Sequence, residues 1–172
     1  MRLHANKLMF MIFLNKFSKH NISISLEVIE FIEKESALSI KTETGGIIAG
    51  TGKIENKNVV ITKASDSGPK AIKRHSFFSR DTKYAQSIID TWASDSNGEI
   101  DYLGEWHKHL EVEPHPSFTD IETMRNIAQQ SNYHISQPIL IIIGESNNRK
   151  SLRLFIVNAN GEIALVPWVL QN

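Results

Sequence analysis

Residues 104–120 read GEWHKHLEVEPHPSFTD and predict a strand, a loop and a helix in succession. The strand begins upstream, in EIDYLGEWHKH, and its alternation puts His107 and His109 on one face. Ser117 and Asp120 then form the S-x-x-D pattern that is typical of a helix start. A strand with two histidines therefore leads into a helix that begins with an acid and can fold back over the strand.

The elements on either side of this stretch alternate between strand and helix. Apolar spacing predicts one helix over residues 26–39, after the cap candidate Ser25, and another over residues 81–94. Residues 138–145, PILIIIGE, are so continuously apolar that this strand should be central and covered on both faces. Further strands are predicted at residues 45–49, 58–64, 152–158 and 162–168, and turn chemistry predicts a loop at residues 65–76. The alternation predicts an α/β (α+β) fold, a mixed sandwich in which helices flank one curved sheet.

The length predicts one domain. A chain of 172 residues with 41% hydrophobic content can close one full core and is short for two. We therefore expect a single domain over residues 1–172. The apolar run LMFMIFL, residues 8–14, is too short to span a bilayer and is predicted to be a buried strand and not a signal sequence.

Charge and cysteine content narrow the chemistry. Lysine plus arginine and aspartate plus glutamate each number 19, so no net field draws the chain to nucleic acid or to anionic lipid, and neither partner is expected. The chain has no cysteine, which removes disulfides, thiolate metal sites and thiol nucleophiles and is compatible with the reducing cytoplasm where we expect the protein. Its chemistry must use oxygen and imidazole groups.

His107, His109 and Asp120 are candidate metal ligands. Two histidines, one carboxylate and an open position are the ligand set of a catalytic zinc ion, with bonds of about 2.0 to 2.2 Å. A structural explanation fits the same residues, because alternate residues on an exposed sheet face are often polar and S-x-x-D is a common capping box. The residues alone leave both explanations open. Three further histidines are predicted to be solvated loop residues: His75, His115 and His134.

A metal hydrolase also needs a base that carries a proton from water to the leaving group. Glu43, in TETGGIIAG, lies at a predicted helix-to-strand junction from which its side chain can reach a neighbouring strand. Glu105 shares the face of the two histidines and is the second candidate, with less freedom to reach over a metal. Taken alone, Glu43 fits a solvated acid at a helix end better than a base.

These residues together resemble a known family. E-x-G-G is followed by an H-x-H strand, a serine eight residues after the second histidine and an aspartate eleven residues after it, which resembles the JAMM motif of JAB/MPN metalloproteases. The matching residues are Glu43, Gly45, Gly46, His107, His109, Ser117 and Asp120. The resemblance covers about residues 8–167 and implies the MPN/cytidine-deaminase-like fold. The chain departs from the family at Leu110, where a proline is usual, so the following loop should be less rigid.

The resemblance implies a zinc peptidase. His107, His109 and Asp120 would hold Zn²⁺, Glu43 would take a proton from the attacking water and return it to the leaving amine, and the Ser117 hydroxyl would help to hold the oxyanion. The scissile carbonyl would belong to the C-terminus of a modifier or a modified protein joined to a lysine.

Shorter stretches point to one group within the family. GPKA before FFSRD, and YLGEWHKH before EPHPSFTD, look like the prokaryotic JAB group. Its members include deconjugating isopeptidases of bacterial antiphage (CBASS) operons, which implies activating and conjugating (E1/E2-like) enzymes of the same operon as possible partners. The C-terminal tail of the substrate would bind along a sheet edge, in a groove with walls at residues 65–76 and 110–116.

Three other functions compete with the peptidase. A metal-free MPN-like scaffold is disfavoured because every part of the site is present. A serine hydrolase with Ser117 as nucleophile lacks a G-x-S-x-G elbow, and a metal phosphoesterase lacks ligands for a second metal and a phosphate-binding glycine loop. The three tryptophans, Trp92, Trp106 and Trp168, are predicted to pack in the core or at its rim.

Overall fold

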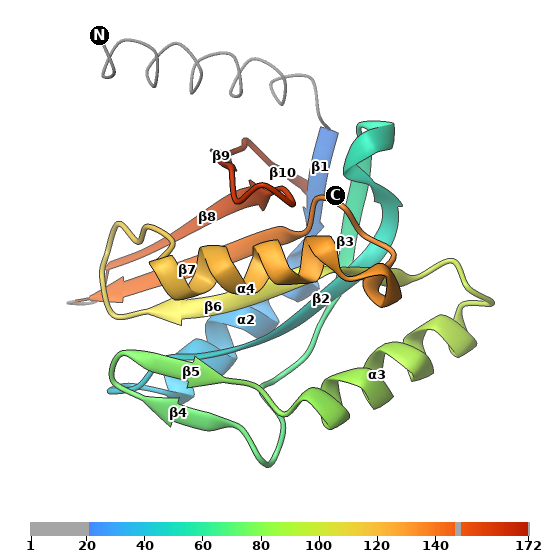
Figure 1. Cartoon of the computed structure of the whole chain (residues 1–172). Helices are drawn as coiled ribbons and strands as arrows, with labels where there is room; N and C mark the ends of the chain where they lie inside the picture. The colour runs from blue at the N-terminus through green and yellow to red at the C-terminus, as the bar shows by residue number, and fades with distance from the viewer. Residues whose placement is uncertain (1–20, 147–148, 172) are drawn as a thin grey trace, which may run out of the picture.

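The computed structural model describes residues 21–146 and 149–171, so the strand predicted at residues 8–14 lies outside the described residues. An eight-stranded sheet has the order β10-β1-β3-β2-β6-β7-β8-β9 (Figure 1). Its strands are β1 (Asn21–Ser25), β2 (Thr44–Lys53), β3 (Asn58–Ala64), β6 (Asp101–His109), β7 (Ile139–Ser146), β8 (Arg149–Val157), β9 (Ile163–Leu165) and β10 (Val169–Gln171). Two short strands, β4 (Ile72–Arg74) and β5 (Phe77–Ser79), form a separate hairpin.

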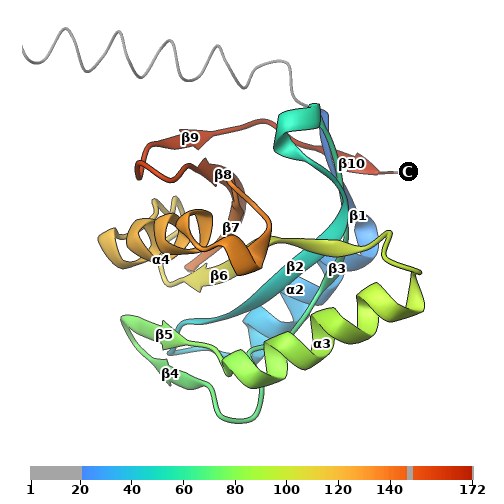
Figure 2. The same cartoon turned by 45° about the vertical axis from the view of Figure 1, so that its right-hand side comes forward.

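Among the described residues, three helices flank the sheet: α2 (Leu26–Leu38), α3 (Thr82–Asp95) and α4 (Phe118–Gln129). Figures 1 and 2 show α2 behind the curved sheet and α4 in front of it, with α3 and the hairpin below β6. Two short 3₁₀ turns, η1 (Ile54–Asn56) and η2 (Ser131–Tyr133), complete the regular elements of the described chain. The mixed α+β fold predicted from the sequence is confirmed. No helix in the described part of the chain is both long and apolar enough to cross a membrane.

The sheet separates two hydrophobic clusters, and β7 contributes to both. Ile139, Ile141 and Ile143 face the cluster that includes Val28 and Ile32 of α2. Alternate residues Leu140 and Ile142 face the cluster that includes Ala85 of α3 and Met124 and Ile127 of α4. The prediction that residues 138–145 form a strand covered on both faces is therefore confirmed, and this strand fixes β6 beside it in parallel register.

Each helix begins at a residue that the sequence indicates. Ser25 and Asp81 accept hydrogen bonds from the backbone amides of Val28 and Tyr84, and Ser117 caps α4 in the same way. Gly104 allows β6 to approach β7, since it has a φ of +149° and a side chain there would meet the backbone of Ile139.

Some predicted elements were wrong or incomplete. Residues 65–76 are not wholly a loop, because β4 lies within them and pairs with β5. The strand predicted over residues 162–168 spans only Ile163–Leu165, and the strands β1 and β10 had no prediction. These strands are three to five residues long, too short to show a decisive alternation, and pairing with neighbours defines them.

The tryptophans pack as predicted. Trp106 is fully buried on the α2 side of the sheet, and its indole donates a hydrogen bond of 2.8 Å to the carbonyl of Ser65. Trp92 and Trp168 are partly buried and pack against the two core clusters. Trp106 therefore faces away from His107 and His109, which lie on the opposite face of β6.

Candidate metal centre

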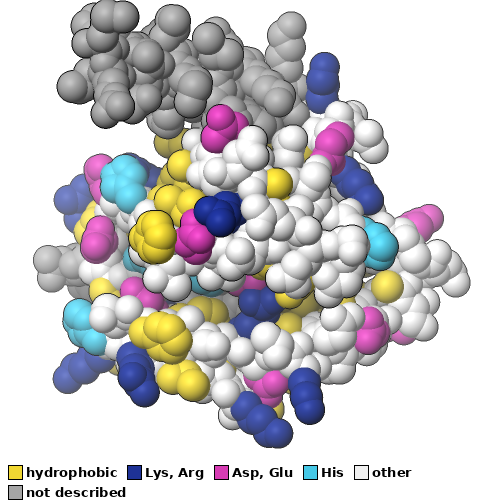
Figure 3. All heavy atoms as spheres, in the orientation of Figure 1, with side chains coloured by type: hydrophobic (Ala, Val, Ile, Leu, Met, Phe, Trp, Pro, Cys, Tyr) yellow, Lys and Arg dark blue, Asp and Glu magenta, His cyan; other side chains and the backbone are white. Residues whose placement is uncertain are grey.

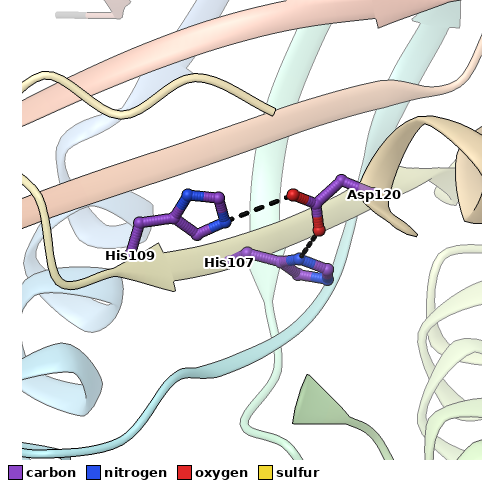
Figure 4. A group of neighbouring side chains, drawn as sticks. All are labelled: His107, His109 and Asp120. Carbon is purple, nitrogen blue, oxygen red and sulfur yellow. Dashed lines mark hydrogen bonds and ion pairs between the residues drawn. The ribbon is translucent and has the colours of Figure 1, made fainter. Parts of the chain in front are cut away.

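The end of β6 and the start of α4 bring three buried polar side chains together. His107 and His109 share one face of β6, and Asp120, in the first turn of α4, lies over them (Figure 4). The Nδ1 atom of His107 is 2.8 Å from Oδ1 of Asp120, and Nε2 of His109 is 3.3 Å from Oδ2. One carboxylate thus faces both imidazoles with a different oxygen for each.

The arrangement fits a metal ion by its donors. One ligand atom from each of His107, His109 and Asp120 can be chosen so that all three lie within 4.8 Å of one another, and each residue is at most 9% exposed. Two imidazoles and a carboxylate, with no thiolate, are ligands that suit zinc and other first-row divalent metals. A buried group of this kind has the donors and the proximity that a divalent cation needs.

Ser117 and Asp120 form a capping box and also belong to the site. The Ser117 hydroxyl accepts a hydrogen bond of 3.1 Å from the Asp120 amide, and Asp120 Oδ2 accepts from the Ser117 amide and hydroxyl, each at 2.7 Å. The two explanations left open by the sequence are therefore compatible, because the cap fixes the carboxylate that faces the histidines. Ser117 itself is exposed at the mouth of the site.

The electrostatics of the three residues are strongly coupled. Burial lowers the pKa of His107, but hydrogen bonds with Asp120 and Glu105 outweigh this effect and raise its pKa from 6.5 to about 9. Burial raises the pKa of Asp120, but the hydrogen bonds with His107 and His109 hold its pKa well below the usual range. Without a metal, a proton on His107 therefore stabilises the group.

This coupling predicts a pH dependence for the metal-free protein. The pKa of His107 in the folded protein lies above its ordinary value. The stabilisation that protonated His107 adds to the free energy of unfolding is therefore fully present below about pH 6.5 and is lost as the pH rises through about 9. We expect the free energy of unfolding to fall over this range by an amount on the order of a few kcal/mol. Urea titrations of chelator-treated protein at pH 6 and pH 9 measure it.

The lowered pKa of Asp120 affects stability at acidic pH. The stabilisation that the ionised carboxylate adds to the free energy of unfolding is present above about pH 4 and is lost as the pH falls below that value. A metal bound to His107 requires the neutral imidazole. The fall in unfolding free energy between pH 6.5 and 9, which arises from His107, should therefore disappear when excess zinc is present. Equal unfolding free energies at pH 6 and pH 9 without metal would contradict the coupling.

Glu43 immediately precedes the first residue of β2 and lines the same cleft as His107, His109 and Asp120. Its neighbours Thr44 and Gly45 pair with Lys108 and His107 of β6, which brings Glu43 toward the end of that strand. The Glu43 amide donates a hydrogen bond of 2.8 Å to the carbonyl of Arg74 in the hairpin. The side chain is half-buried, and this burial raises the pKa of Glu43 against the opposing effect of His109. A carboxylate with a raised pKa is a stronger base than a solvated one.

Glu105, the second candidate base, has partners that a free base lacks. It is 1% exposed and forms an ion pair with Arg80. The Tyr102 hydroxyl donates to it at 3.4 Å, and Nε2 of His107 lies 3.4 Å from its other oxygen. These contacts leave Glu105 without an oxygen directed to solvent, and they favour Glu43 as the base.

A cleft of about 440 Å³ opens over the three residues. The hairpin forms one wall with Ser76, Phe77 and Phe78, and the other wall includes Glu111 and His115. Figure 3 shows this face, hollowed between α4 and the hairpin, with histidine and acidic side chains along the hollow. The loop at 110–116 lines the cleft as predicted, but residues 65–76 contribute only Ser76, and β5 replaces the rest of the predicted wall. His75, His115 and His134 are exposed, as predicted.

The loop after His109 is fastened without a proline at Leu110. Arg153 Nη2 on β8 is 3.2 Å from the carboxylate of Glu113, and the Ser151 hydroxyl donates to the carbonyl of Val112. Pro114 packs against β7 where Gly144 lacks a side chain that would clash with it. Residues of two other strands, β7 and β8, therefore contact this loop, although Leu110 stands where a proline is usual.

The sequence did not identify Arg80 and Phe78 as parts of the site. Phe78 packs edge-on against the His107 ring, with centroids 5.3 Å apart and planes at 80°. Gly45 makes room for this contact, since a Cβ there would lie 2.8 Å from Phe78 and 2.9 Å from His107. Both residues lie in FFSRD, a stretch that resembles the prokaryotic JAB group, and a second signal for Arg80 was Glu105, an acid on a buried strand that needs a counter-charge.

Comparisons with known proteins agree with these features. Residues 28–155 match a family described as prokaryotic homologs of the JAB domain. The chain is 32% identical over 113 residues to a protein named CD-NTase/cGAS isopeptidase from Escherichia coli (strain TW11681), covering 66% of this chain and 71% of that protein. It is also 32% identical over 123 residues to a protein named Probable metalloprotease y4qB from Sinorhizobium fredii, covering 71% and 74% of the two.

A solved structure shares the fold at low sequence identity. The solution structure of protein DSY2949 from Desulfitobacterium hafniense superimposes with a TM-score of 0.67 at 14% identity, covering 88% of this chain and 93% of that one. This likeness concerns the fold alone. The family match and the two sequence relatives bear on the chemistry.

Proposed function

Because this chain belongs to the family of prokaryotic homologs of the JAB domain, we propose that it is a zinc-dependent isopeptidase that removes a ubiquitin-like modifier or a conjugated protein from its target. The observation that carries the proposal is the buried cluster of His107, His109 and Asp120 at the base of a cleft that Glu43 also lines. We further propose that residues 1–172 act as one JAB/MPN-like domain. The relative named as a metalloprotease supports the metal, and the relatives named as isopeptidases support the bond.

His107, His109 and Asp120 would hold Zn²⁺. When bound, the ion would supply a Lewis acid that activates water and polarises a carbonyl. The donor set supports this choice, since two histidines and one carboxylate leave a fourth position for a small ligand. The same donors also suit iron, so the metal must be identified by analysis and not only by loss of activity.

The remaining steps belong to side chains of this chain. Glu43 would accept one proton from water as the water oxygen adds to the scissile carbonyl carbon. The Ser117 hydroxyl, exposed at the cleft mouth, would turn its one proton from Asp120 Oδ2 to the oxygen that becomes negatively charged. Glu43 would then return the proton to the amine nitrogen as the carbon–nitrogen bond breaks, leaving a carboxylate and a free amine.

The cleft supports an extended substrate. A C-terminal tail could lie between the hairpin and α4 and bring its last carbonyl to the buried cluster, with backbone hydrogen bonds to strand edges providing affinity. The relatives named CD-NTase/cGAS isopeptidase suggest a conjugated protein as the substrate. By this analogy we propose a role in a CBASS-like antiphage conjugation system of the cytoplasm, beside E1/E2-like enzymes.

The test is cleavage of two matched substrates that carry the tail of a candidate modifier, one in a linear fusion and one linked to lysine. The proposal predicts hydrolysis that a chelator stops and that stoichiometric zinc restores better than iron or manganese. Serine-directed reagents should have no effect. A protein that binds substrate but hydrolyses neither form, with or without added zinc, would be a scaffold and not an isopeptidase.

A further inference from the structure

An ion pair that is largely shielded from solvent lies beside the candidate metal centre, in the wall of the same cleft. Arg80 and Glu105 have side chains that are 12% and 2% exposed, and Nη1 of Arg80 contacts Oε1 of Glu105. The other oxygen of Glu105, Oε2, lies 3.4 Å from Nε2 of His107. Glu105 therefore connects Arg80 to the ring nitrogen of His107 that is turned away from Asp120.

The backbone around Arg80 is held firmly. Arg80 lies between β5 and α3, and the next residue, Asp81, is the N-cap of α3. The Asp81 amide donates to the carbonyl of Ser67 at 2.9 Å, and its carboxylate accepts from the amides of Tyr84 and Lys70. Arg80 is thus presented to Glu105 from a fixed point and not from a free loop.

The two histidines differ in how many groups fix them. The ring of His107 contacts Asp120 on α4, Glu105 on β6 and the edge of Phe78 on β5. Within the described residues, the ring of His109 has a single polar contact, which is with Asp120. His107 is therefore oriented before a metal arrives, while His109 has more freedom to adjust.

We propose that Arg80 and Glu105 are positioning residues that hold the His107 ring in the orientation that receives the metal. The role rests on the proposed function, because it assigns a purpose to the pair only if His107 is a ligand. A carboxylate that accepts a hydrogen bond from the second nitrogen of a ligating histidine fixes the ring, and loss of such a partner typically weakens metal affinity by about 10- to 100-fold. Arg80 acts through Glu105 by holding that carboxylate in place.

The experiment measures the zinc dissociation constant by competition with a chromophoric chelator, with four variants beside the native protein. Arg80→Met removes the charge and keeps the stem, Arg80→Lys keeps the charge, Glu105→Gln keeps the shape, and the fourth variant combines Arg80→Met with Glu105→Gln. We expect the dissociation constant to rise about tenfold or more in Arg80→Met and Glu105→Gln. Arg80→Lys should recover part of the affinity, and the double variant should be no weaker than Glu105→Gln alone, since Arg80 acts through Glu105.

Two further readouts separate positioning from general stability. The visible spectrum of the cobalt-substituted protein should change in Arg80→Met, because it reports the geometry of the ligands. Arg125→Met is the matched control, since it removes a half-exposed ion pair with Glu122 on α4, and its zinc affinity should remain within about twofold of native. If Arg80→Met does not fold by circular dichroism, Glu105→Gln carries the test.

The outcomes are distinct. Zinc affinities within about twofold of native in both Arg80→Met and Glu105→Gln, with an unchanged cobalt spectrum, would overturn the positioning role and leave the proposed function standing. A native protein that takes up no zinc would overturn the proposed function, and the positioning role with it. A tenfold loss in both variants with a native Arg125→Met control supports the role.

Discussion

Glu43→Gln is expected to lower the rate of peptide-bond cleavage by about 10²- to 10⁴-fold while the protein keeps its zinc. The amide has the shape of the carboxylate but cannot accept a proton from water or return one to the leaving amine. The structure supports this expectation because Glu43 lines the cleft beside His107, His109 and Asp120, and because burial raises its pKa. Single-turnover cleavage at saturating zinc, with metal content measured on the same sample, checks both halves of the prediction.

Two glutamates provide controls. Glu30 lies on the exposed face of α2, so Glu30→Gln should leave cleavage unchanged. Glu105→Gln should retain most of the cleavage rate once zinc is saturating, because Glu105 is held by Arg80 and Tyr102 and is not expected to act as the base. A Glu43→Gln protein that cleaves within tenfold of native would contradict the assignment of Glu43 as the base.

Asp120→Asn is expected to have the second large effect, and it acts in two ways. A neutral amide oxygen is a weaker metal ligand than a carboxylate, so we expect zinc affinity to fall by about 100-fold or more. The same carboxylate accepts from the Ser117 amide and hydroxyl and faces both histidines. We therefore also expect the metal-free protein to lose about 1 to 2 kcal/mol of unfolding free energy, as for a lost helix cap.

A cap elsewhere in the chain separates the two effects. Ser25 caps α2 by accepting from the Val28 amide, on the face of the sheet opposite α4. Ser25→Ala should cost about 1 kcal/mol and leave zinc affinity unchanged. Equilibrium unfolding without metal and chelator competition with metal give the two quantities. Native zinc affinity in Asp120→Asn, with only the stability lost, would reduce Asp120 to a cap.

Much of the fold followed from local patterns in the sequence. The helix starts at Ser25, Asp81 and Ser117 carry a capping side chain, and β7 is apolar on both faces, so each could be predicted without knowledge of its neighbours. The short strands β1, β4, β5 and β10 could not, because three to five residues fix no period and their pairing depends on which segments meet in space.

Some contacts of the candidate site could likewise be predicted from the sequence, and others could not. The convergence of His107 and His109 follows from alternation on one strand, and the approach of Asp120 follows from the helix that begins just after the loop. The contact of Arg80 with Glu105 crosses from the hairpin to the sheet, and no spacing in the sequence encodes it. Likewise, the fastening of the loop after Leu110 depends on Arg153 and Ser151 of a distant strand.

The central claim is that His107, His109 and Asp120 hold one zinc ion that the cleavage reaction requires. The most direct measurement is elemental analysis of native protein and of His107→Ala purified in parallel, with cleavage assayed on the same samples. The account predicts about one zinc per chain in the native protein, and little zinc and no cleavage in His107→Ala. Native protein without metal, or equal zinc content in both proteins, would contradict it.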